Sequence, residues 1–436
     1  MPACHLTVRS IWKTARRCAP DRPGRQENPV STLNANDIPA DIPAQRKLTG
    51  GVLTLLAGLS AIGALSTNII LPSFPSMATE FGVSTRDLGL TLSSFFVAFA
   101  IGQLLVGPLS DRYGRKKLVL GGLIVFLAGT ALCATADTLE TMIIGRVVQA
   151  LGVCAASVLS RAIARDLFDG EALSRALSLT MIAMAAAPGF SPLLGSTMDA
   201  TLGWRATFLL VGLSGGALAL YYLFGMGETH PADRRAAHTA RTVAVAYGRL
   251  VTDRRFIVPA LAVSLIVGGL YAFFGAAPAI LIGVIGLSPI QLGLFFAATV
   301  FIVFGAGLLA PRLAHRWEAA KVATAGIAIA LAGGVILLAG GGTPSLPLFA
   351  AGIVVFLFGM GLVNPLGTAI ALQPFGTQAG LASALLGFLQ MACAALATAL
   401  STALPYDSWT ALGVILTVTA SLALLLFLRT APRPNR

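Results

Sequence analysis

The chain has 436 residues, of which 56% are hydrophobic and only 11% charged, whereas soluble domains carry about 25% charged residues. A mean hydropathy of +0.83 excludes a soluble globular protein, because so little polar surface cannot enclose a core of this size. The net charge of +12 does not indicate a nucleic-acid-binding protein either, since the basic residues lie in short turns and tails and form no single patch.

The first 47 residues differ in composition from the rest of the chain. They are rich in Pro, Asn, Asp and Arg and contain no apolar run. A secretory signal peptide needs an apolar stretch of roughly 7–15 residues, so this region does not qualify as one. We expect residues 1–47 to form a disordered tail on the cytoplasmic side of a membrane.

Apolar runs separated by polar breaks fill the chain from residue 48 to residue 430. A bilayer-spanning helix needs roughly 20 apolar residues, and twelve runs approach this length. The first six are predicted near 50–72, 88–109, 118–136, 141–162, 175–197 and 205–226, and the second six near 257–282, 290–311, 322–341, 346–371, 379–402 and 409–428. The sequence therefore predicts an all-α polytopic membrane protein with twelve transmembrane helices.

The longest internal break, 227–256, carries six arginines and divides the spans into two sets of six. Gly107-Pro-Leu-Ser-Asp-Arg112 aligns with Gly307-Leu-Leu-Ala-Pro-Arg312 at an offset of 200 residues, and each segment ends the second helix of its set. We expect two pseudo-symmetric six-helix bundles joined by a basic cytoplasmic linker and followed by a cytoplasmic tail. The predicted boundaries are 48–226 and 257–430 for the bundles, 227–256 for the linker and 431–436 for the tail.

The basic residues predict the orientation in the membrane. Of the 30 Lys and Arg residues, 27 lie in segments on the same side as both termini, and only Arg86 and Arg205 lie in loops on the other side. Cytoplasmic segments of membrane proteins carry the excess of Lys and Arg. Both termini are therefore expected in the cytoplasm, with the protein in the inner (plasma) membrane.

The predicted spans contain no constellation for catalysis or metal binding. All 18 Asp and Glu residues and all four His residues lie in tails, loops or helix ends. The five cysteines show no metal-ligand spacing, and we expect neither a disulfide nor a metal site. The pattern argues against an enzyme and predicts no cofactor.

Arg146 is the one charged residue in the interior of a predicted span. A central arginine costs about 2.5–3.5 kcal/mol on insertion scales, so its side chain should face the bundle interior or water. Helical spacing places Gln149, Ser157 and Ser160 on the same polar face. Arg146 is therefore either a structural residue that bonds backbone carbonyls or a functional residue of a transport pathway.

Further polar side chains inside the spans are candidates for substrate contact. Each of them alone is equally compatible with an inter-helix hydrogen bond worth under about 1 kcal/mol. Together they predict a neutral, weakly polar cavity with aromatic walls. The candidates are Thr67, Asn68, Gln149, Tyr271, Asn364 and Gln390.

The segment 107–117 places five charged residues between two spans, so it is predicted to form a tight turn at one membrane face. We expect Asp111 to accept hydrogen bonds from backbone N–H groups at a neighbouring helix N-terminus, while Arg112 and Arg115 tie adjacent helix ends. Such a cluster would act as a conformational latch. The alternative is simple positive-inside anchoring, which explains neither Asp111 nor Gly114.

These segments resemble signatures of the major facilitator superfamily. The segment 107–117 resembles its loop 2–3 signature, 146–152 resembles its fourth-helix motif, and 187–196 resembles its fifth-helix antiporter motif. Asn364-Pro365 and the stretch 374–390 are similar to the Bcr/CflA branch of drug exporters. The resemblance covers residues 48–430.

The resemblance implies a secondary transporter that exports amphipathic drugs or metabolites by proton-coupled antiport and alternating access. It implies a proton-relay role for Arg146. The implied partners are a small-molecule substrate, protons and membrane lipid, without nucleic acid, and a single twelve-helix bundle that encloses its own pathway is expected to be a monomer. The implied latch residues are Gly107, Asp111, Arg112, Gly114 and Arg115, and the implied packing residues of the antiporter motif are Pro188, Gly189, Pro192 and Gly195.

Asn68 departs from the family pattern. It stands where the family usually has an aspartate used in proton or cation handling, and an asparagine does not titrate. Coupling would then use an acid at a loop edge such as Asp87 or Asp199, or would be absent. The alternative function is an uncoupled facilitator or exchanger of a neutral metabolite, and a transporter-shaped sensor is a third hypothesis.

Overall fold

The computed structural model describes residues 49–231, 233, 235 and 240–429, so the predicted tails at 1–47 and 431–436 lie outside the described residues. All regular structure in the described part of the chain is helical. Twelve segments of the described residues are long and apolar enough to cross a membrane, as the sequence predicts. The first six comprise α2 (Gly50–Asn68) with η1 (Leu71–Ser73) and α3 (Phe74–Phe81), α4 (Gly89–Tyr113), α5 (Arg115–Ala134), α6 (Leu139–Leu167), α7 (Gly170–Leu202) and α8 (Arg205–Gly225).

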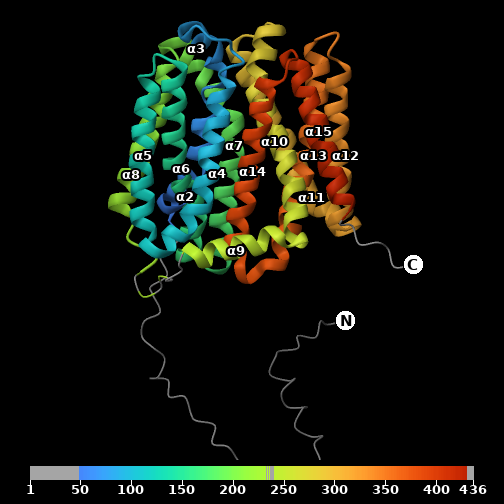
Figure 1. Ribbon diagram of the computed structural model, residues 1–436. Helices are drawn as coiled ribbons and strands as arrows, with labels where there is room; N and C mark the ends of the chain where they lie inside the picture. Colours follow the sequence, from blue (N-terminus) through green and yellow to red (C-terminus); the bar gives the residue numbers. More distant parts are fainter. Residues whose placement is uncertain (1–48, 232, 234, 236–239, 430–436) are drawn as a thin grey trace, which may run out of the picture. The chain divides into compact units, whose positions relative to one another are not determined.

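A short helix outside the twelve spans opens the second half. This helix, α9 (Ala240–Thr252), lies within the predicted linker and runs across one end of the bundle (Figure 1). Six spans follow it: α10 (Arg254–Ala277) with the π-helical η3 (Pro278–Val284), α11 (Pro289–Trp317), α12 (Ala319–Ala339), α13 (Leu346–Leu372) with η4 (Gln373–Gln378), α14 (Ala379–Ala403) and α15 (Ser408–Leu428).

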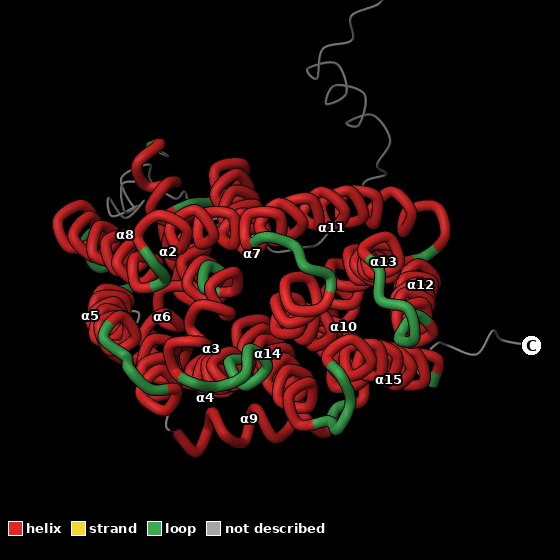
Figure 2. Tube along the Cα trace, turned by 90° about the horizontal axis from the view of Figure 1, so that it is seen from above, coloured by secondary structure: helices red, strands yellow, loops and turns green. Residues whose placement is uncertain are grey.

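The helices form two groups when viewed along the bundle (Figure 2). One group holds α2 and α4–α8, the other holds α10–α15, and the groups meet through α4 against α14 and α7 against α11. The chain therefore folds into the two six-helix halves that the sequence predicts.

Closely packed glycines occupy equivalent positions in the two halves. Gly122 and Gly129 of α5 face Gly145 and Gly152 of α6, and the same seven-residue spacing recurs in the second half at Gly326 and Gly333 of α12 and Gly352 and Gly359 of α13. An added Cβ on Gly122 would lie 2.7 Å from the Gly152 carbonyl oxygen, and one on Gly326 would lie 3.0 Å from that of Gly359. Small residues let membrane helices approach closely, and here they do so at equivalent places in both halves.

The turn in segment 107–117 is tighter than the sequence prediction. Helix α4 continues through Asp111 and Arg112 to Tyr113, and α5 starts at Arg115, so Gly114 alone connects the two spans. Its φ of 93° lies in a region that residues other than glycine rarely adopt. The charged residues therefore extend from two helix ends and do not form a loop.

Candidate functional site

Arg146 lies fully buried in the first half, where α2, α4 and α6 meet. Helix α6 begins at a Thr138 cap whose side chain accepts the Thr141 N–H. Two turns further on, Arg146 Nη1 donates to the Ser66 carbonyl of α2 at 2.9 Å and to Gln149 Oε1 at 2.5 Å. The guanidinium carbon lies 4.4 Å from the centre of the Phe95 ring of α4, a geometry that favours a cation.

The hydrogen bonds continue from Arg146 into α5. Gln149 Nε2 donates to Thr130 Oγ1 at 2.9 Å, and that hydroxyl donates to the Phe126 carbonyl at 2.7 Å. Gln149 is itself fully buried, so in this conformation both ends of its amide bond protein groups. Gln149 therefore orients Arg146, and its substrate contact stays a prediction.

The charge of Arg146 is stabilised without a carboxylate. Its Nε and Nη2 have no hydrogen-bond partner, and no ion pair involves Arg146 within the described residues. A buried charge needs compensation from neighbouring dipoles, and here a carbonyl, an amide oxygen and an aromatic face provide it. Arg146 therefore bonds a backbone carbonyl, as the structural interpretation predicts, and also keeps two guanidinium nitrogens unpaired.

Thr67 and Asn68 lie buried near the end of α2, close to the Ser66 carbonyl. Both side chains bond back along their own helix, Thr67 Oγ1 to the Gly63 carbonyl at 2.7 Å and Asn68 Nδ2 to the Ala64 carbonyl at 2.8 Å. The Asn68 Oδ1 atom has no hydrogen-bond partner in the part of the chain that the structure describes. The substrate-contact candidates of the first half, Thr67, Asn68 and Gln149, thus lie close to the Arg146 group, by which we mean Arg146, Ser66, Phe95 and Gln149.

An aromatic path links this group to the second half. Phe95 contacts Phe96, whose ring centre lies 4.5 Å from that of Tyr271 in α10, and Tyr271 in turn packs against Phe274. The predicted cavity with aromatic walls stays a prediction. Asn364, which is exposed, and Gln390, which is half-buried, have no hydrogen bond to the Arg146 group among the described residues.

The residues of segment 107–117 form an ion-pair network. Arg115 Nη1 bonds Asp111 Oδ1 at 2.6 Å and the Ser110 hydroxyl, and its Nε bonds Asp166 Oδ2 at the end of α6 at 3.2 Å. Arg115 thus ties the ends of α4, α5 and α6 together, as predicted for this arginine but not seen for Arg112, and the latch role stays a prediction. Arg112 is exposed and lies over the Tyr113 ring, and an added Cβ at Gly107 would meet no atom within 4 Å.

Glu228, and not Asp111, caps the neighbouring helix. Glu228 Oε1 accepts the backbone N–H of Arg115 at 2.8 Å, and Oε2 accepts that of Lys116 at 3.3 Å. The prediction for Asp111 was wrong because that carboxylate is already paired with the Arg115 side chain one turn away. The sequence holds one weak signal for Glu228, an acid directly after a helix of the same half.

The antiporter-motif residues pack α7 against both halves. An added Cβ at Gly195 would overlap the Ile69 carbonyl at the end of α2, and one at Gly189 would overlap Val300 of α11. Pro192 is buried and Pro188 is half-buried. These residues therefore bring α7 into tight contact with α2 in its own half and with α11 in the other.

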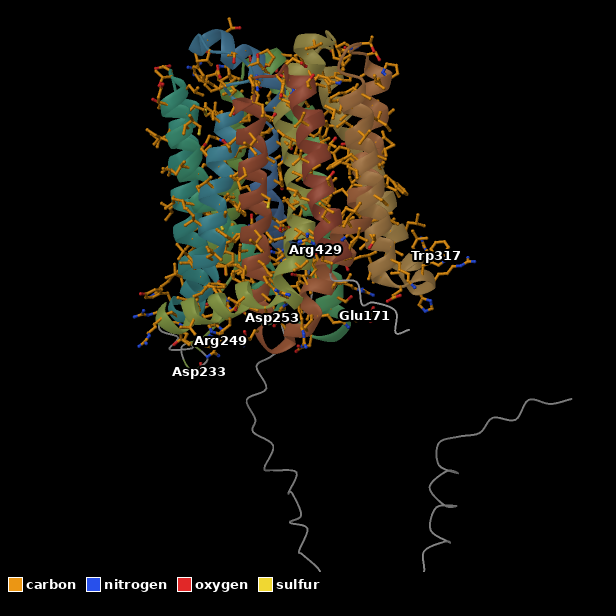
Figure 3. The ribbon with its side chains drawn as sticks, turned by 45° about the vertical axis from the view of Figure 1, so that its right-hand side comes forward. Glu171, Asp233, Arg249, Asp253, Trp317 and Arg429 are labelled. Carbon is orange, nitrogen blue, oxygen red and sulfur yellow. The ribbon has the colours of Figure 1, made fainter. Side chains whose placement is uncertain are left out.

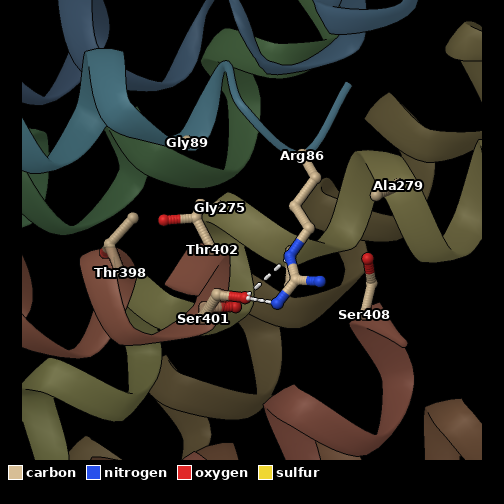
Figure 4. A pocket seen from close by; sticks show the side chains of 9 residues that line it. Arg86, Gly89, Gly275, Ala279, Thr398, Ser401, Thr402 and Ser408 are labelled. Atoms are coloured by element: carbon tan, nitrogen blue, oxygen red, sulfur yellow. Dashed lines mark hydrogen bonds between the residues drawn. The ribbon is translucent and has the colours of Figure 1, made fainter. Parts of the chain in front are cut away.

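Arg86 joins the halves just before the start of α4, whereas the Arg115 network lies at the other end of that helix. Figure 4 shows the Arg86 side chain bonded to Ser401 of α14. Its Nε and Nη2 donate to the Ser401 carbonyl at 3.1 and 2.8 Å, Nη2 also reaches the Leu404 carbonyl at 2.5 Å, and Nη1 reaches the Tyr406 carbonyl at 2.8 Å. The carbonyls lie at the C-terminal end of α14, which attracts a cation. The cavity beside Arg86 measures only about 10 Å³.

Comparison with known proteins places these features in one family. The sequence profile of the Major Facilitator Superfamily matches residues 56–398. Multidrug resistance protein D of Escherichia coli (strain K12) is 28% identical over 393 residues, which cover 89% of this chain and 98% of that protein. A bicyclomycin resistance protein homolog of Haemophilus influenzae (strain ATCC 51907 / DSM 11121 / KW20 / Rd) is 28% identical over 368 residues, or 84% of this chain and 92% of that protein.

Solved structures show the same fold. A bacterial homolog of the human lysosomal transporter Spinster, in an inward-facing and unoccupied conformation, matches with a TM-score of 0.69 at 17% identity, covering 89% of this chain and all of that one. Twelve apolar helices and the bacterial relatives make this a multi-pass plasma-membrane protein and a transporter, not an enzyme. The chain belongs to the major facilitator superfamily.

Proposed function

We propose that this secondary transporter exports small amphipathic molecules, drugs or metabolites, out of the cell by proton-coupled antiport. The names of its relatives support drug export, and the path of aromatic rings from Phe95 to Phe274 supports a substrate with apolar surface. The single observation that carries the proposal is the buried Arg146, held by neutral groups on three helices with two nitrogens unpaired. A transport protein retains such a costly charge where it acts on a substrate or a proton.

Arg146 acts in this proposal as a fixed charge. A guanidinium does not lose its proton in proteins, so Arg146 cannot be the group that carries the proton. The positive field of Arg146 would lower the affinity of nearby sites for both protons and cationic substrates. In this way it would couple proton binding to substrate binding. The proton relay expected from the family thus becomes an electrostatic role, with the proton on a separate group.

Asp199 is the acid we propose for the proton. Both of its oxygens accept bonds from the Ser76 hydroxyl of α3, at 3.2 and 3.1 Å. It lies one turn beyond Gly195, which packs on Ile69, the residue that follows Asn68. Asp87 is less suitable because it caps its own turn, where it accepts both the Ser84 N–H and the Ser84 hydroxyl.

Alternating access would use two closures at opposite ends of the bundle. We propose that the contact between Arg86 and α14 closes the outer end, and that the network of Asp111, Gly114 and Arg115 is the latch at the inner end. The arginine-rich end would face the cytoplasm with both termini, because 27 of the 30 Lys and Arg residues belong to that side. The halves would move as the units 48–226 and 257–430 of a monomer.

Flux in membrane vesicles tests the function. Efflux of a fluorescent amphipathic dye is measured in vesicles with and without an imposed pH gradient, and vesicles without the protein serve as the control. Proton-coupled antiport requires faster flux with the gradient. Equal protein-dependent flux in both conditions favours the second candidate, an uncoupled facilitator, which the neutral Asn68 supports.

A further inference from the structure

The linker helix α9 is packed firmly on the end of the bundle. Its residues Val243, Ala246, Tyr247 and Leu250 lie on one side, with the spacing of a helix face, and all are at least half-buried. Leu250 is only 2% exposed and belongs to an apolar cluster with α10, α13 and α14. The opposite side of α9 is exposed.

Tyr247 fixes α9 to the first half as well. Its hydroxyl donates to the Leu104 carbonyl of α4 at 3.1 Å. Residue 108, four positions along the helix, is a proline and has no N–H for this carbonyl, so Tyr247 supplies the missing donor. Burial, together with the charge of Asp111, raises the pKa of Tyr247 to about 12, so the hydroxyl keeps its proton at neutral pH.

A groove of about 590 Å³ lies between α9 and η4. Two exposed arginines of α9, Arg241 and Arg249, line it about 12 Å apart along the helix at 1.5 Å per residue. Neither has an ion-pair partner among the described residues. Figure 3 shows Arg249 at the end of the bundle where Asp253 also lies. The lining residues are Arg241, Thr242, Val245, Ala246, Arg249 and Gln378.

The chemistry of this groove selects an anion that also has an apolar part. Two guanidinium groups provide donors that match phosphate oxygens, and the lining contains no acid. Val245, which is 48% exposed, provides an apolar surface between the arginines. Because α9 crosses the ends of membrane-spanning helices, the groove lies at the level where lipid headgroups meet a bundle, and basic pockets there bind anionic lipid.

We propose that the groove between α9 and η4 binds the phosphodiester headgroup of an anionic phospholipid. Arg241 and Arg249 would hold the phosphate oxygens, Gln378 would donate a further hydrogen bond, and Val245 would contact the apolar part of the lipid. The bound lipid would join the linker helix to the turn between α13 and α14.

Lipid retention measures this binding without transport. The full-length protein is purified in detergent and titrated with phosphatidylglycerol or phosphatidylcholine, and bound lipid is counted by native mass spectrometry. We expect preferential retention of phosphatidylglycerol, and a loss of affinity of at least about tenfold in the double variant Arg241→Gln/Arg249→Gln, given the contribution of each surface arginine to lipid attraction.

The control variant removes the same charge elsewhere at this end of the bundle. Arg312 and Arg316 of α11 are exposed, and Arg312→Gln/Arg316→Gln should retain the lipid as the parent protein does. Equal loss in both double variants would show unspecific charge attraction and overturn the proposal. Complete displacement of the lipid by millimolar inorganic phosphate would also overturn it, in favour of a free-phosphate site. Melting temperatures confirm that all variants fold.

Discussion

At the scale of single residues, Arg146 is the group with the most distinctive surroundings. Its three neutral partners come from α2, α4 and α6, so its position depends on how these helices pack. Nothing in this arrangement neutralises the charge. Because its partners are neutral, the guanidinium keeps its electric field inside the bundle. Coupling through a fixed charge requires such a field.

Replacement of Arg146 tests this role. Arg146→Lys keeps the charge but cannot bond Ser66 and Gln149 while stacking on Phe95, and Arg146→Ala removes the charge. We expect transport at least about tenfold slower in both, at normal abundance in the membrane, since about 1.4 kcal/mol suffices for that change. Arg175→Lys, at an exposed ion pair, is the control. Parental flux in both Arg146 variants would leave it a structural residue.

Asn68 offers a site where a titratable group can be restored. Its Oδ1 accepts no hydrogen bond from the described residues and lies in α2 near the Ser66 carbonyl that Arg146 bonds. Asn68→Asp introduces an acid into the field of Arg146, so we expect a larger difference between flux with and without a pH gradient. Gln291→Glu, which adds an acid at an exposed position of α11, should not produce it. If Asn68→Asp does not increase the difference between the two fluxes, proton coupling does not use this position.

At the scale of helices, the adjacent glycines Gly121 and Gly122 of α5 allow the effect of helix packing on stability to be measured separately from that of helix propensity. An added Cβ on Gly122 would meet the Gly152 carbonyl and Ala155 of α6, whereas one on Gly121 meets nothing within 4 Å. Gly121→Ala should leave the melting temperature unchanged or raise it, because alanine favours a helix by about 0.5–1 kcal/mol. Gly122→Ala should lower it by forcing α5 and α6 apart. Equal shifts in the two variants would contradict close packing.

The cap that Glu228 provides to α5 makes a second prediction at this scale. Glu228→Ala removes the acceptor for two backbone N–H groups, and loss of a helix cap typically costs about 1 kcal/mol. We expect a lower melting temperature and greater protease sensitivity near residue 114. Glu171→Ala, which removes an exposed acid of α7, should change neither. If Glu228→Ala changes neither the melting temperature nor the protease sensitivity, Glu228 does not contribute to the latch.

At the scale of the whole molecule, Arg86 holds the two halves together at one end. Arg86→Ala removes four hydrogen bonds to α14 and its following turn, so the population that is open at this end should increase. Spin labels at Thr79 and Thr343, one in each half, would report longer distances. Arg205→Ala removes ion pairs to Glu80 and Asp137 within the first half and should leave these distances unchanged. Unchanged distances in Arg86→Ala would show that other contacts keep this end closed.

The sequence by itself determined the twelve membrane helices, their division into two halves and the inward position of Arg146. Apolar length and the cost of a charge in lipid are local properties of a chain, so they can be read along it. The glycines spaced by seven residues in α5, α6, α12 and α13 were also visible in the sequence, but their meaning depends on which helices face each other.

Only the tertiary structure decided the partners of these residues. Gln149 bonds Thr130, Glu228 caps Arg115, and Arg86 bonds carbonyls more than 300 positions away. Such pairs depend on the angles and registers at which helices cross, and a hydrophobic pattern does not encode them because many registers bury the same apolar surface. The sequence thus identified which residues are costly to bury, and the packing of the bundle determined what each of them contacts.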